Sequence, residues 1–315
     1  MGKLNHNLNQ AKQAKNDEFY TQLADIEKEL QYYKEQLENK VVFCNCDDPE
    51  WSNFWRYFSL NFDYLGLKRL IATHFDPEKP SYKLEIVRGI KGVVKTPLKQ
   101  NGDFRSPECL NLLQECDIVV TNPPFSLFRE YLDVVHRSGK KFLIIGNLNA
   151  ITYKETFKLI QNNELWLGVN SGRFEFMVPP HYQSNEKITR FDEQGNKYVR
   201  FGNIGWYTNM EHRKRHEPLQ LYRKYDPMHY PKYDNYDAIE VSKVSDIPED
   251  YDGLMGVPIT FLDKYNPDQF EIIGIDFELI EKNNEKFRGK TSRFYIDGKK
   301  IYARIVIRNK NPIVR

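Results

Sequence analysis

The nine residues Asp-Ile-Val-Val-Thr-Asn-Pro-Pro-Phe, at positions 117–125, decide the fold that we expect. Ile118–Thr121 is a run of β-branched residues, which is typical of a buried strand. Pro123 and Pro124 end this strand, because proline has no N–H to donate and its ring fixes φ. Beyond Ser126, a suitable helix N-cap, apolar residues recur with the spacing of one helix face, at Leu127, Phe128, Tyr131, Leu132 and Val135. The stretch predicts a strand, a rigid turn and a helix, and in an open α/β sheet such a turn lies at the carboxyl edge, where ligands bind.

The turn Asn122-Pro123-Pro124-Phe125 suits methyl transfer to the exocyclic amine of adenine. That amine is a poor nucleophile, because its lone pair is delocalised into the ring. The amide oxygen of Asn122 and the carbonyl of Pro123 could each accept one N–H and aim the lone pair at an electrophilic methyl group. Phe125 would offer a flat face to a base taken out of the duplex. The four residues are the signature of amino-methyltransferases that use S-adenosylmethionine; the alternative is an ordinary proline-stopped turn.

Composition bounds the class of protein. The 315 residues suffice for one large domain or two moderate ones. Hydrophobic residues make up 40% of the chain, and no apolar run approaches the ~20 residues of a membrane span. The polar first ten residues lack the apolar region of a signal peptide. These features predict a cytoplasmic protein with no membrane partner.

The four cysteines are Cys44, Cys46, Cys109 and Cys116. None forms a C-x₂-C pair and the histidines complete no zinc pattern, so no metal site is expected and reduced thiols are the default. No Pro-Cys pair occurs, which argues against a thiolate that attacks cytosine.

Positive charge gathers toward the end of the chain. The net charge is only +2, but residues 286–315 hold ten Lys or Arg against one acid, Asp297. A basic segment of this kind is suited to binding a phosphate backbone, and the alternative is a merely solvated tail. The alternation of apolar with polar or charged residues over 301–308 predicts a strand. The basic cluster at 212–216 and the tyrosines of 222–237 also suit nucleic acid, with a tyrosine-rich loop packed on the core as the alternative.

Strands and helices alternate over residues 41–170, which predicts a parallel doubly wound sheet. Its strands are expected at 41–44, 70–73, 118–121 and 141–147, with a further short strand at 85–88. Later strands, at 165–169, 174–178 and 204–208, have no helix between them and are expected to be antiparallel. One helix that runs to about residue 39 is predicted by Leu23, Ile26, Leu30, Tyr33 and Leu37.

Three loops carry candidate ligands for a nucleoside. The first strand runs into residues 45–49, where the lack of glycine fits a ligand without phosphates; a plain turn is the alternative. Asp76 follows the second strand, where an acid often holds ribose hydroxyls, although Asp76-Pro77 is also a good turn. Asp103 and Phe104, at the end of a third strand, could hydrogen-bond and sandwich an adenine.

The chain resembles the EcoRI-type adenine-specific DNA methyltransferases. The similar blocks run nearly end to end, at residues 15–22, 41–49, 102–106, 117–132 and 256–270. The resemblance implies a Rossmann-like seven-stranded methyltransferase sheet, mostly parallel with an antiparallel edge, in a cofactor-binding and catalytic domain at residues 1–210. It implies a target-recognition region that binds DNA at residues 211–315.

The same resemblance implies roles for single residues. Residues 19–21 would lie along the methionyl end of the cofactor, the turn at 46–49 would replace the usual glycine-rich loop, and the pair at 103–104 would contact its adenine. S-adenosyl-L-methionine would thus be bound by Phe19, Tyr20, Thr21, Cys46, Asp47, Asp103, Phe104 and Asn122. The catalytic tetrapeptide is matched by Asn122, Pro123, Pro124 and Phe125. Phe176 matches a second aromatic near the flipped base.

We interpret the chain as a DNA adenine-N6 methyltransferase that acts as a monomer on double-stranded DNA, the protecting partner of a bacterial or phage restriction system. One alternative is a methyltransferase that acts on RNA or on a glutamine side chain. Those enzymes also use Asn-Pro-Pro turns, but their catalytic domain usually nearly ends the chain, whereas about 100 residues follow residue 210 here. The other is a binding protein that has lost catalysis, which the intact tetrapeptide at 122–125 disfavours.

Overall fold

A computed structural model describes residues 19–46, 48–78, 80–178, 182, 188–283 and 293–313. The chain divides into two compact units. The first comprises the residues up to 150 together with 167–210, and the second comprises 151–166 with 211–315. The segment 151–166 thus groups with the second unit, although it precedes residue 210 in the chain. Among the described residues, no helix is both long and apolar enough to cross a membrane.

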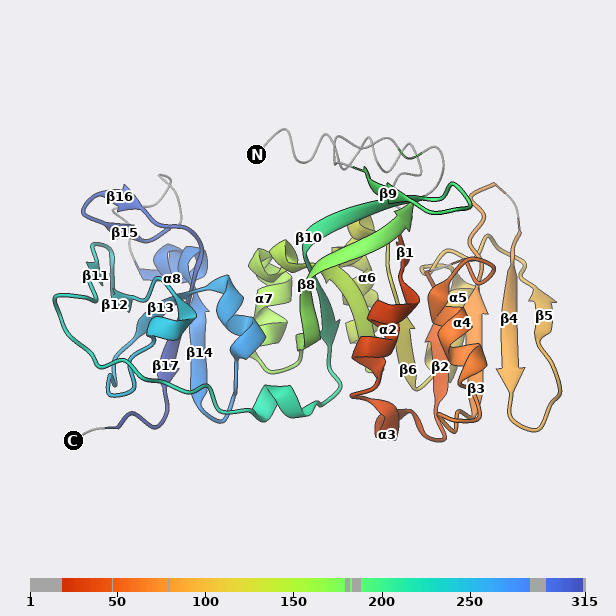
Figure 1. The fold of residues 1–315 in the computed structure, drawn as a ribbon, viewed down its shortest axis with the longest axis horizontal. Coiled ribbons are helices and arrows are strands. Elements are labelled where there is room, and N and C mark those ends of the chain that lie inside the picture. Colours follow the sequence, from red (N-terminus) through yellow and green to blue (C-terminus); the bar gives the residue numbers. More distant parts are fainter. Residues whose placement is uncertain are drawn as a thin grey trace. The chain divides into compact units, whose positions relative to one another are not determined.

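A large mixed sheet forms the first unit (Figure 1), with ten strands among the described residues. The strand order is β1-β8-β10-β7-β6-β2-β3-β4-β5, and β9 pairs with β10. In chain order the strands are β1 (Tyr20–Thr21), β2 (Val41–Cys44), β3 (Arg69–Thr73), β4 (Tyr82–Val87), β5 (Val94–Pro97), β6 (Ile118–Thr121), β7 (Lys141–Asn147), β8 (Trp166–Val178), β9 (Ile188–Phe191) and β10 (Lys197–Thr208).

The centre of this sheet is parallel. β2 pairs in parallel with β3 and with β6, and β6 pairs in parallel with β7. Every residue of β2 and β6 is buried, as expected of parallel strands covered on both faces. The helices of this unit are α2 (Leu23–Leu30), α3 (Lys34–Leu37), α4 (Asn53–Leu60), α5 (Pro107–Glu115) and α6 (Phe128–Arg137). The parallel strands predicted at 41–44, 70–73, 118–121 and 141–147 are therefore confirmed.

Both flanks of the sheet are antiparallel. β10 runs antiparallel to β7, as predicted for the later strands. On the other flank, β4 and β5 form an antiparallel hairpin beside β3, where the sequence predicted only a short strand at 85–88. β5 is mostly exposed, so it lacks the apolar alternation by which a strand is recognised.

Three local predictions need correction. The helix predicted to reach residue 39 breaks into α2 and α3, because the N–H groups of Tyr32 and Tyr33 bond to carbonyls three residues earlier and not four. After α3, Asn39 takes φ +57° and its N–H bonds to the Gly66 carbonyl. The strands predicted at 165–169 and 174–178 are one strand, β8, in which Gly172 at φ +119° bends the chain without ending it. Ser126 does not cap α6; it lies in a 3₁₀ turn, η1 (Phe125–Leu127), and α6 begins at Phe128.

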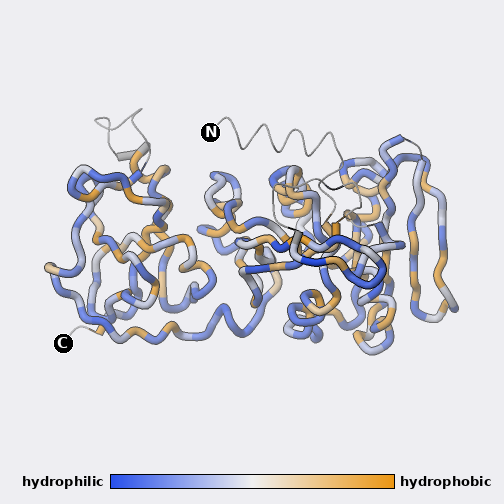
Figure 2. The backbone as a smooth tube through the Cα atoms, turned by 45° about the horizontal axis from the view of Figure 1, so that its top comes forward, coloured by the Kyte–Doolittle hydropathy of each residue, from blue (hydrophilic) through white to orange (hydrophobic). Residues whose placement is uncertain are grey.

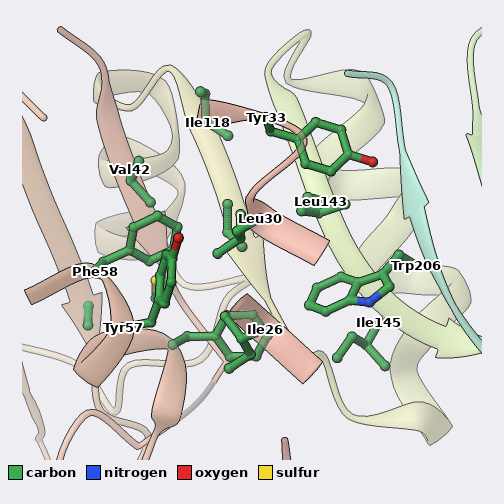
Figure 3. Close-up of a cluster of buried hydrophobic side chains, with 14 of the residues drawn as sticks. Ile26, Leu30, Tyr33, Val42, Tyr57, Phe58, Ile118, Leu143, Ile145 and Trp206 are labelled. Carbon is green, nitrogen blue, oxygen red and sulfur yellow. The ribbon is translucent and has the colours of Figure 1, made fainter. Parts of the chain in front are cut away.

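A buried apolar cluster fixes the parallel strands in place (Figure 3). Figure 3 shows side chains of two helices, α2 and α4, facing those of the strands. The labelled members are Ile26, Leu30, Tyr33, Val42, Tyr57, Phe58, Ile118, Leu143, Ile145 and Trp206. Burial of each large apolar side chain contributes about 1.5–3 kcal/mol. Hydrophobic and hydrophilic stretches accordingly alternate along the backbone (Figure 2).

The second unit has its own five-stranded sheet, in the order β11-β12-β13-β17-β14, with a separate β15–β16 hairpin. The strands are β11 (Lys232–Tyr233), β12 (Tyr236–Glu240), β13 (Met255–Pro258), β14 (Phe270–Ile275), β15 (Tyr295–Ile296), β16 (Lys299–Lys300) and β17 (Arg304–Asn309). Its helices are α7 (Lys154–Gln161) and α8 (Asp276–Asn283), with 3₁₀ turns η3 (Arg213–His216), η4 (Val244–Asp246) and η5 (Ile259–Lys264). β17 is the strand that the alternation over 301–308 predicts.

Candidate active site

Loops that follow three parallel strands meet at one edge of the large sheet. β2 lies between β3 and β6 and is parallel to both, so the carboxyl ends of the three strands are adjacent. Their loops begin at Asn45, His74 and Asn122. This is the edge at which open α/β sheets bind ligands.

Asn122 follows β6 directly and is 6% exposed. Its Nδ2 donates a hydrogen bond of 2.6 Å to the backbone carbonyl of Phe19. This bond fixes the plane of the amide and directs its donor end to Phe19, so the Oδ1 end faces the other way. An amide oxygen is the acceptor that an amine substrate requires. The preceding residue, Thr121, accepts the N–H of Cys46 at 3.2 Å and so ties this loop to the one after β2.

The rest of the tetrapeptide joins an aromatic cluster. Pro124 is extended, with φ −54° and ψ 126°, and Phe125 begins η1. The ring centroid of Phe125 lies 5.3 Å from that of Phe19 and 6.0 Å from that of Phe176. Phe201 of β10 also packs on this cluster, 4.8 Å from Phe19 and 5.8 Å from Phe176. Phe125 and Phe201 are only partly buried, so each retains ring surface on which a planar base could stack.

Residues 19–21 are held as a short edge strand. β1 pairs antiparallel with β8, with Thr21 opposite Phe176. Asn53 of α4 donates from Nδ2 to the Thr21 carbonyl at 2.7 Å. The Thr21 hydroxyl is buried and has no hydrogen-bond partner in the part of the chain that the structure describes. A buried hydroxyl in this state suits the polar end of a bound ligand.

The loop after β2 is fixed by a side chain of α6. Tyr131 is fully buried, and its hydroxyl donates to Oδ1 of Asn45. Burial raises the pKa of Tyr131 well above its ordinary value, so the hydroxyl remains a donor at neutral pH. Cys46 is partly buried beside Asn45, whereas Asp47 lies outside the described residues.

The loops after β3 and β5 are packed against each other. The N–H of Asp76 donates to the carbonyl of Asn101 at 2.9 Å. Gly102 takes φ +80°, and a Cβ at this position would lie 1.9 Å from the carbonyl oxygen of His74. Only glycine allows so close an approach of two backbones in this conformation. The candidate ribose acid at 76 and the candidate adenine pair at 103–104 are therefore neighbours.

Asp103 and Phe104 lie in the loop between β5 and α5, and not at the end of a third strand as predicted. Arg105 donates to Asp103 three times, from its N and Nε at 2.8 Å each and from Nη2 at 2.6 Å. These bonds lower the pKa of Asp103, so the carboxylate is charged at neutral pH. A carboxylate has about four acceptor positions, so Asp103 keeps capacity for one more donor such as an amine. Phe104 is buried and meets Tyr131 edge-on at 5.1 Å.

The chemistry of this edge fits a cationic nucleoside better than a phosphate ester. Asp48, Asp76 and Asp103 bring carboxylates, which accept from hydroxyls and amines and repel phosphates. The aromatic rings around Phe19 can stabilise a cation such as a sulfonium. Among the described residues, no group of three or more His, Cys, Asp or Glu could hold a metal ion.

The sequence matches the family described as Adenine-specific methyltransferase EcoRI over residues 7–310. The chain belongs to this family. It is 50% identical to the Type II methyltransferase M.EcoRI of Escherichia coli, over 96% of either chain. It is 39% identical to M.MpnI of Mycoplasma pneumoniae, over 98% of this chain and all of the relative, and 38% identical to M.MgeORF184P of Mycoplasma genitalium, over 97% and 99%. No solved structure matches the chain significantly.

The resemblance stated from the sequence is thereby confirmed, and this EcoRI-family chain is an adenine-specific methyltransferase enzyme. The family assignment concerns the whole chain. It does not by itself say which side chains perform the chemistry, so the roles of single residues depend on the geometry.

The basic cluster at 212–216 is largely paired within the second unit. Arg215 is buried, bonds to Glu211 and stacks over the Trp166 ring at 3.7 Å. The ring of His216 bonds to Asp268 at 2.8 Å and to Glu211 at 3.0 Å, and these two carboxylates raise the pKa of His216. Arg215 and His216, two members of the cluster predicted to contact nucleic acid, therefore bond to residues of the second unit.

The sequence predicted that the tyrosines of 222–237 either contact nucleic acid or pack on the core, and the structure shows both buried and exposed tyrosines. Tyr230 and Tyr233 are buried, and Tyr225 packs on Tyr251 at 4.4 Å. Tyr222, in contrast, is 80% exposed. Most of these tyrosines are thus packed within the second unit of this EcoRI-family enzyme, and Tyr222 remains at the surface.

Sequence reasoning missed the side chains that hold the site from a distance. Asn122 and its partner Phe19 are 103 residues apart, and Tyr131 and Asn45 are 86 apart. Phe201 and Asn53 carry no motif of their own. A single sequence offers no signal for such pairs, because a hydrogen bond between distant segments depends on the fold and leaves no local pattern.

Proposed function

We propose that this enzyme is a site-specific DNA adenine-N6 methyltransferase that uses S-adenosyl-L-methionine and serves as the modification arm of a restriction-modification system. The observation that carries the proposal is the placement of Asn122, whose amide is oriented by the Phe19 carbonyl at the carboxyl end of β6. Relatives named Type II methyltransferases over nearly the whole chain support the same activity.

Four residues would handle the flipped adenine. The ring of Phe125 stacks on the base, while Asn122 Oδ1 and the Pro123 carbonyl each accept one N–H of the N6 amine. Two acceptors placed in this way draw the nitrogen toward tetrahedral geometry and turn its lone pair away from the ring. Pro124 keeps the loop from moving, so the geometry exists before the substrate arrives.

The donor supplies an electrophilic methyl group on a sulfonium. The N6 lone pair would form the new N–C bond, and the electron pair of the broken C–S bond would stay on sulfur. The amine then releases one proton to solvent. Asn122 and Pro123 stabilise the partial positive charge that develops on N6, so no covalent bond to the enzyme is needed.

The cofactor would lie along the carboxyl edge. Residues 19–21 would meet its methionyl end, where the buried Thr21 hydroxyl offers a hydrogen bond. Cys46 and Asp47 would line the middle, with Asp76 near the ribose. Asp103 would accept from the adenine amine, and Phe104 would cover the ring.

The proposal includes a seven-stranded methyltransferase sheet and a division of the chain into two domains. The run β4-β3-β2-β6-β7-β10-β8 has seven strands, with a parallel centre and an antiparallel strand inserted between β7 and β8. We take this run as the methyltransferase sheet, with β1, β5 and β9 as additions. We take residues 1–210 as the catalytic domain and 211–315 as the target-recognition region that contacts double-stranded DNA. A monomer in the cytoplasm suits an enzyme that marks one strand at a time.

The test is to express the chain in a host free of DNA methylation and to sequence the genome with modified-base detection. The expected result is N6-methyladenine in a single sequence motif, absent when the host carries an empty vector. An unmodified genome in cells that contain the folded protein would overturn the proposal. Transfer of a tritiated methyl group to RNA or protein in place of DNA would assign the enzyme to one of the alternatives.

A further inference from the structure

Glu29 is a buried carboxylate that the proposed mechanism does not use. It lies in α2 and is 0% exposed, and it forms no ion pair within the described part of the chain. Burial raises the pKa of Glu29, which reflects the cost of removing a carboxylate from water. A group of this kind is retained only where its hydrogen bonds offset that cost.

Four donors converge on this carboxylate. Oε1 accepts from the Tyr33 hydroxyl at 3.0 Å and from the Val169 N–H at 2.8 Å. Oε2 accepts from the Asn170 N–H at 2.8 Å and from Asn170 Nδ2 at 2.7 Å. Both oxygens are therefore satisfied, and three of the four bonds reach across to β8.

The strand is shaped to receive this carboxylate. At Gly168 a Cβ would lie 2.3 Å from Oε1 of Glu29 and 2.7 Å from the Cβ of Trp206. Any larger residue would push the carboxylate away from the N–H groups of Val169 and Asn170. Glu29 thus fastens α2 to β8 at one fixed position.

α2 follows residues 19–21 with only Gln22 between them. The Phe19 carbonyl at the start of this segment accepts from Asn122 Nδ2, and β1 pairs with the far part of β8. A helix is stiff, so a shift of α2 along β8 would move the short segment that precedes it. The orientation of the Asn122 amide therefore depends on where α2 sits.

From this geometry, and resting on the function proposed above, we infer that Glu29 is a positioning residue for methyl transfer. By fixing α2 to β8 it holds the Phe19 carbonyl at the point where that carbonyl orients Asn122. Glu29 touches neither substrate nor cofactor. Because residues 19–21 are also proposed to meet the methionyl end of the cofactor, the loss of Glu29 should lower the rate of the chemical step much more than it weakens cofactor binding.

The first test compares Glu29→Gln with Glu27→Gln in the full chain. Glu27 lies in the same helix but is exposed, so it controls for the chemical change. Gln has the size of Glu, but its Nε2 would face the N–H donors of β8. With tritiated S-adenosylmethionine and a duplex that carries the target motif, we expect Glu29→Gln to lower the single-turnover rate constant about 10- to 100-fold. The Kd values for S-adenosylhomocysteine and for the duplex should stay within about threefold of wild type, and Glu27→Gln should match wild type throughout.

A milder variant covers the case in which Glu29→Gln does not fold. Asn170→Ala removes the Nδ2 donor, which bonds to Glu29 and, at 3.2 Å, to the Lys28 carbonyl of the same helix; it leaves the carboxylate and both N–H groups of β8 in place. The expected decrease in the single-turnover rate constant is about three- to tenfold, again with unchanged Kd values.

A double-mutant cycle separates positioning from general destabilisation. Asn122→Asp keeps an acceptor oxygen but loses the N–H that binds Phe19. If Glu29 acts through that bond, adding Glu29→Gln to Asn122→Asp should lower the residual rate by less than about threefold.

Several results would overturn the inference. One is a Glu29→Gln rate equal to wild type; another is a loss that multiplies fully with that of Asn122→Asp; a third is a fall in cofactor affinity equal to the fall in rate. If the wild-type chain methylates DNA and the variants give these results, only the role of Glu29 fails. A wild-type chain that transfers no methyl group to DNA overturns the proposed function and this inference together.

Discussion

Two neighbouring loops at the carboxyl edge of the sheet are held in place by different means. The loop after β6 contains two prolines, which restrict its backbone covalently, and it is anchored to Phe19 by one hydrogen bond. The loop after β2 contains one proline, Pro49, so its backbone is restricted less than that of residues 122–125. It is held by hydroxyls of two other elements: that of Tyr131 in α6 donates to Asn45, and that of Thr121 in β6 accepts the N–H of Cys46.

The difference matches what each loop is proposed to do. Methyl transfer requires acceptors in fixed positions. Because the prolines already restrict residues 122–125, little conformational entropy is lost when the reaction occurs. Cofactor binding tolerates a loop that adjusts, because the product must also leave. Substitutions in the first loop should therefore change the rate, and substitutions around the second should change binding.

The largest expected effect follows from Asn122→Ala. Loss of the amide removes one acceptor from the amine and the anchor to Phe19, so single-turnover methylation should fall by about 100- to 1,000-fold. The Kd for S-adenosylhomocysteine should change by less than about threefold, because the loop after β2 is untouched. Calorimetric titration beside the rate assay checks both values. An equal loss of rate and of cofactor affinity would remove the distinction between the two loops.

Tyr131→Phe tests the other loop by deletion of a single oxygen atom. Asn45 Oδ1 would lose the hydroxyl donor, and a buried hydrogen bond that is broken in this way costs about 1–3 kcal/mol. We expect the KM for S-adenosylmethionine to rise about tenfold, with kcat within about twofold of wild type. Steady-state kinetics with the cofactor varied at saturating DNA measures both. A kcat that falls while KM stays constant would show that α6 acts on the tetrapeptide and not on the cofactor loop.

The sequence predicted those parts of the enzyme whose structure is determined by residues adjacent in the chain. The parallel strands could be read from runs such as 118–121, and the turn that ends β6 from the residue types of 122–125. α5 also followed a local rule, since the Ser106 hydroxyl accepts the N–H of Cys109 at its start. In each case the residues that cause the structure are adjacent in the chain.

The features that the sequence did not predict depend on residues far away in the chain. β5 is recognisable as a strand only through its pairing with β4, because its side chains are mostly exposed. The support of Asn122 by Phe19 spans 103 residues, and no spacing in the sequence announces it.

A third loop at the same edge is held by charge, and this predicts a smaller, pH-dependent effect. Asp103 pairs with Arg105, which lowers the pKa of Asp103 below its ordinary 3.8. A carboxylate whose pKa is lowered in the folded state stabilises that state at pH values above its ordinary pKa. This stabilisation is lost as the pH falls through the lowered pKa. Asp103→Asn keeps the shape and removes the charge. Because the Arg105 side chain is 43% exposed, solvent screens the pair, and the expected destabilisation at pH 7 is below about 1 kcal/mol.

Urea unfolding of the wild-type enzyme and of Asp103→Asn at pH 7, 5 and 3 measures that difference. It should be nearly constant from pH 7 to 5 and shrink toward zero near pH 3, as the wild-type carboxylate becomes protonated. The Tyr131–Asn45 hydrogen bond joins two neutral groups, so Tyr131→Phe should show a stability difference that does not vary over this range. If the Asp103→Asn difference persisted unchanged at pH 3, the loop at 101–104 would be held by the close approach of Gly102 to His74, and charge would contribute nothing.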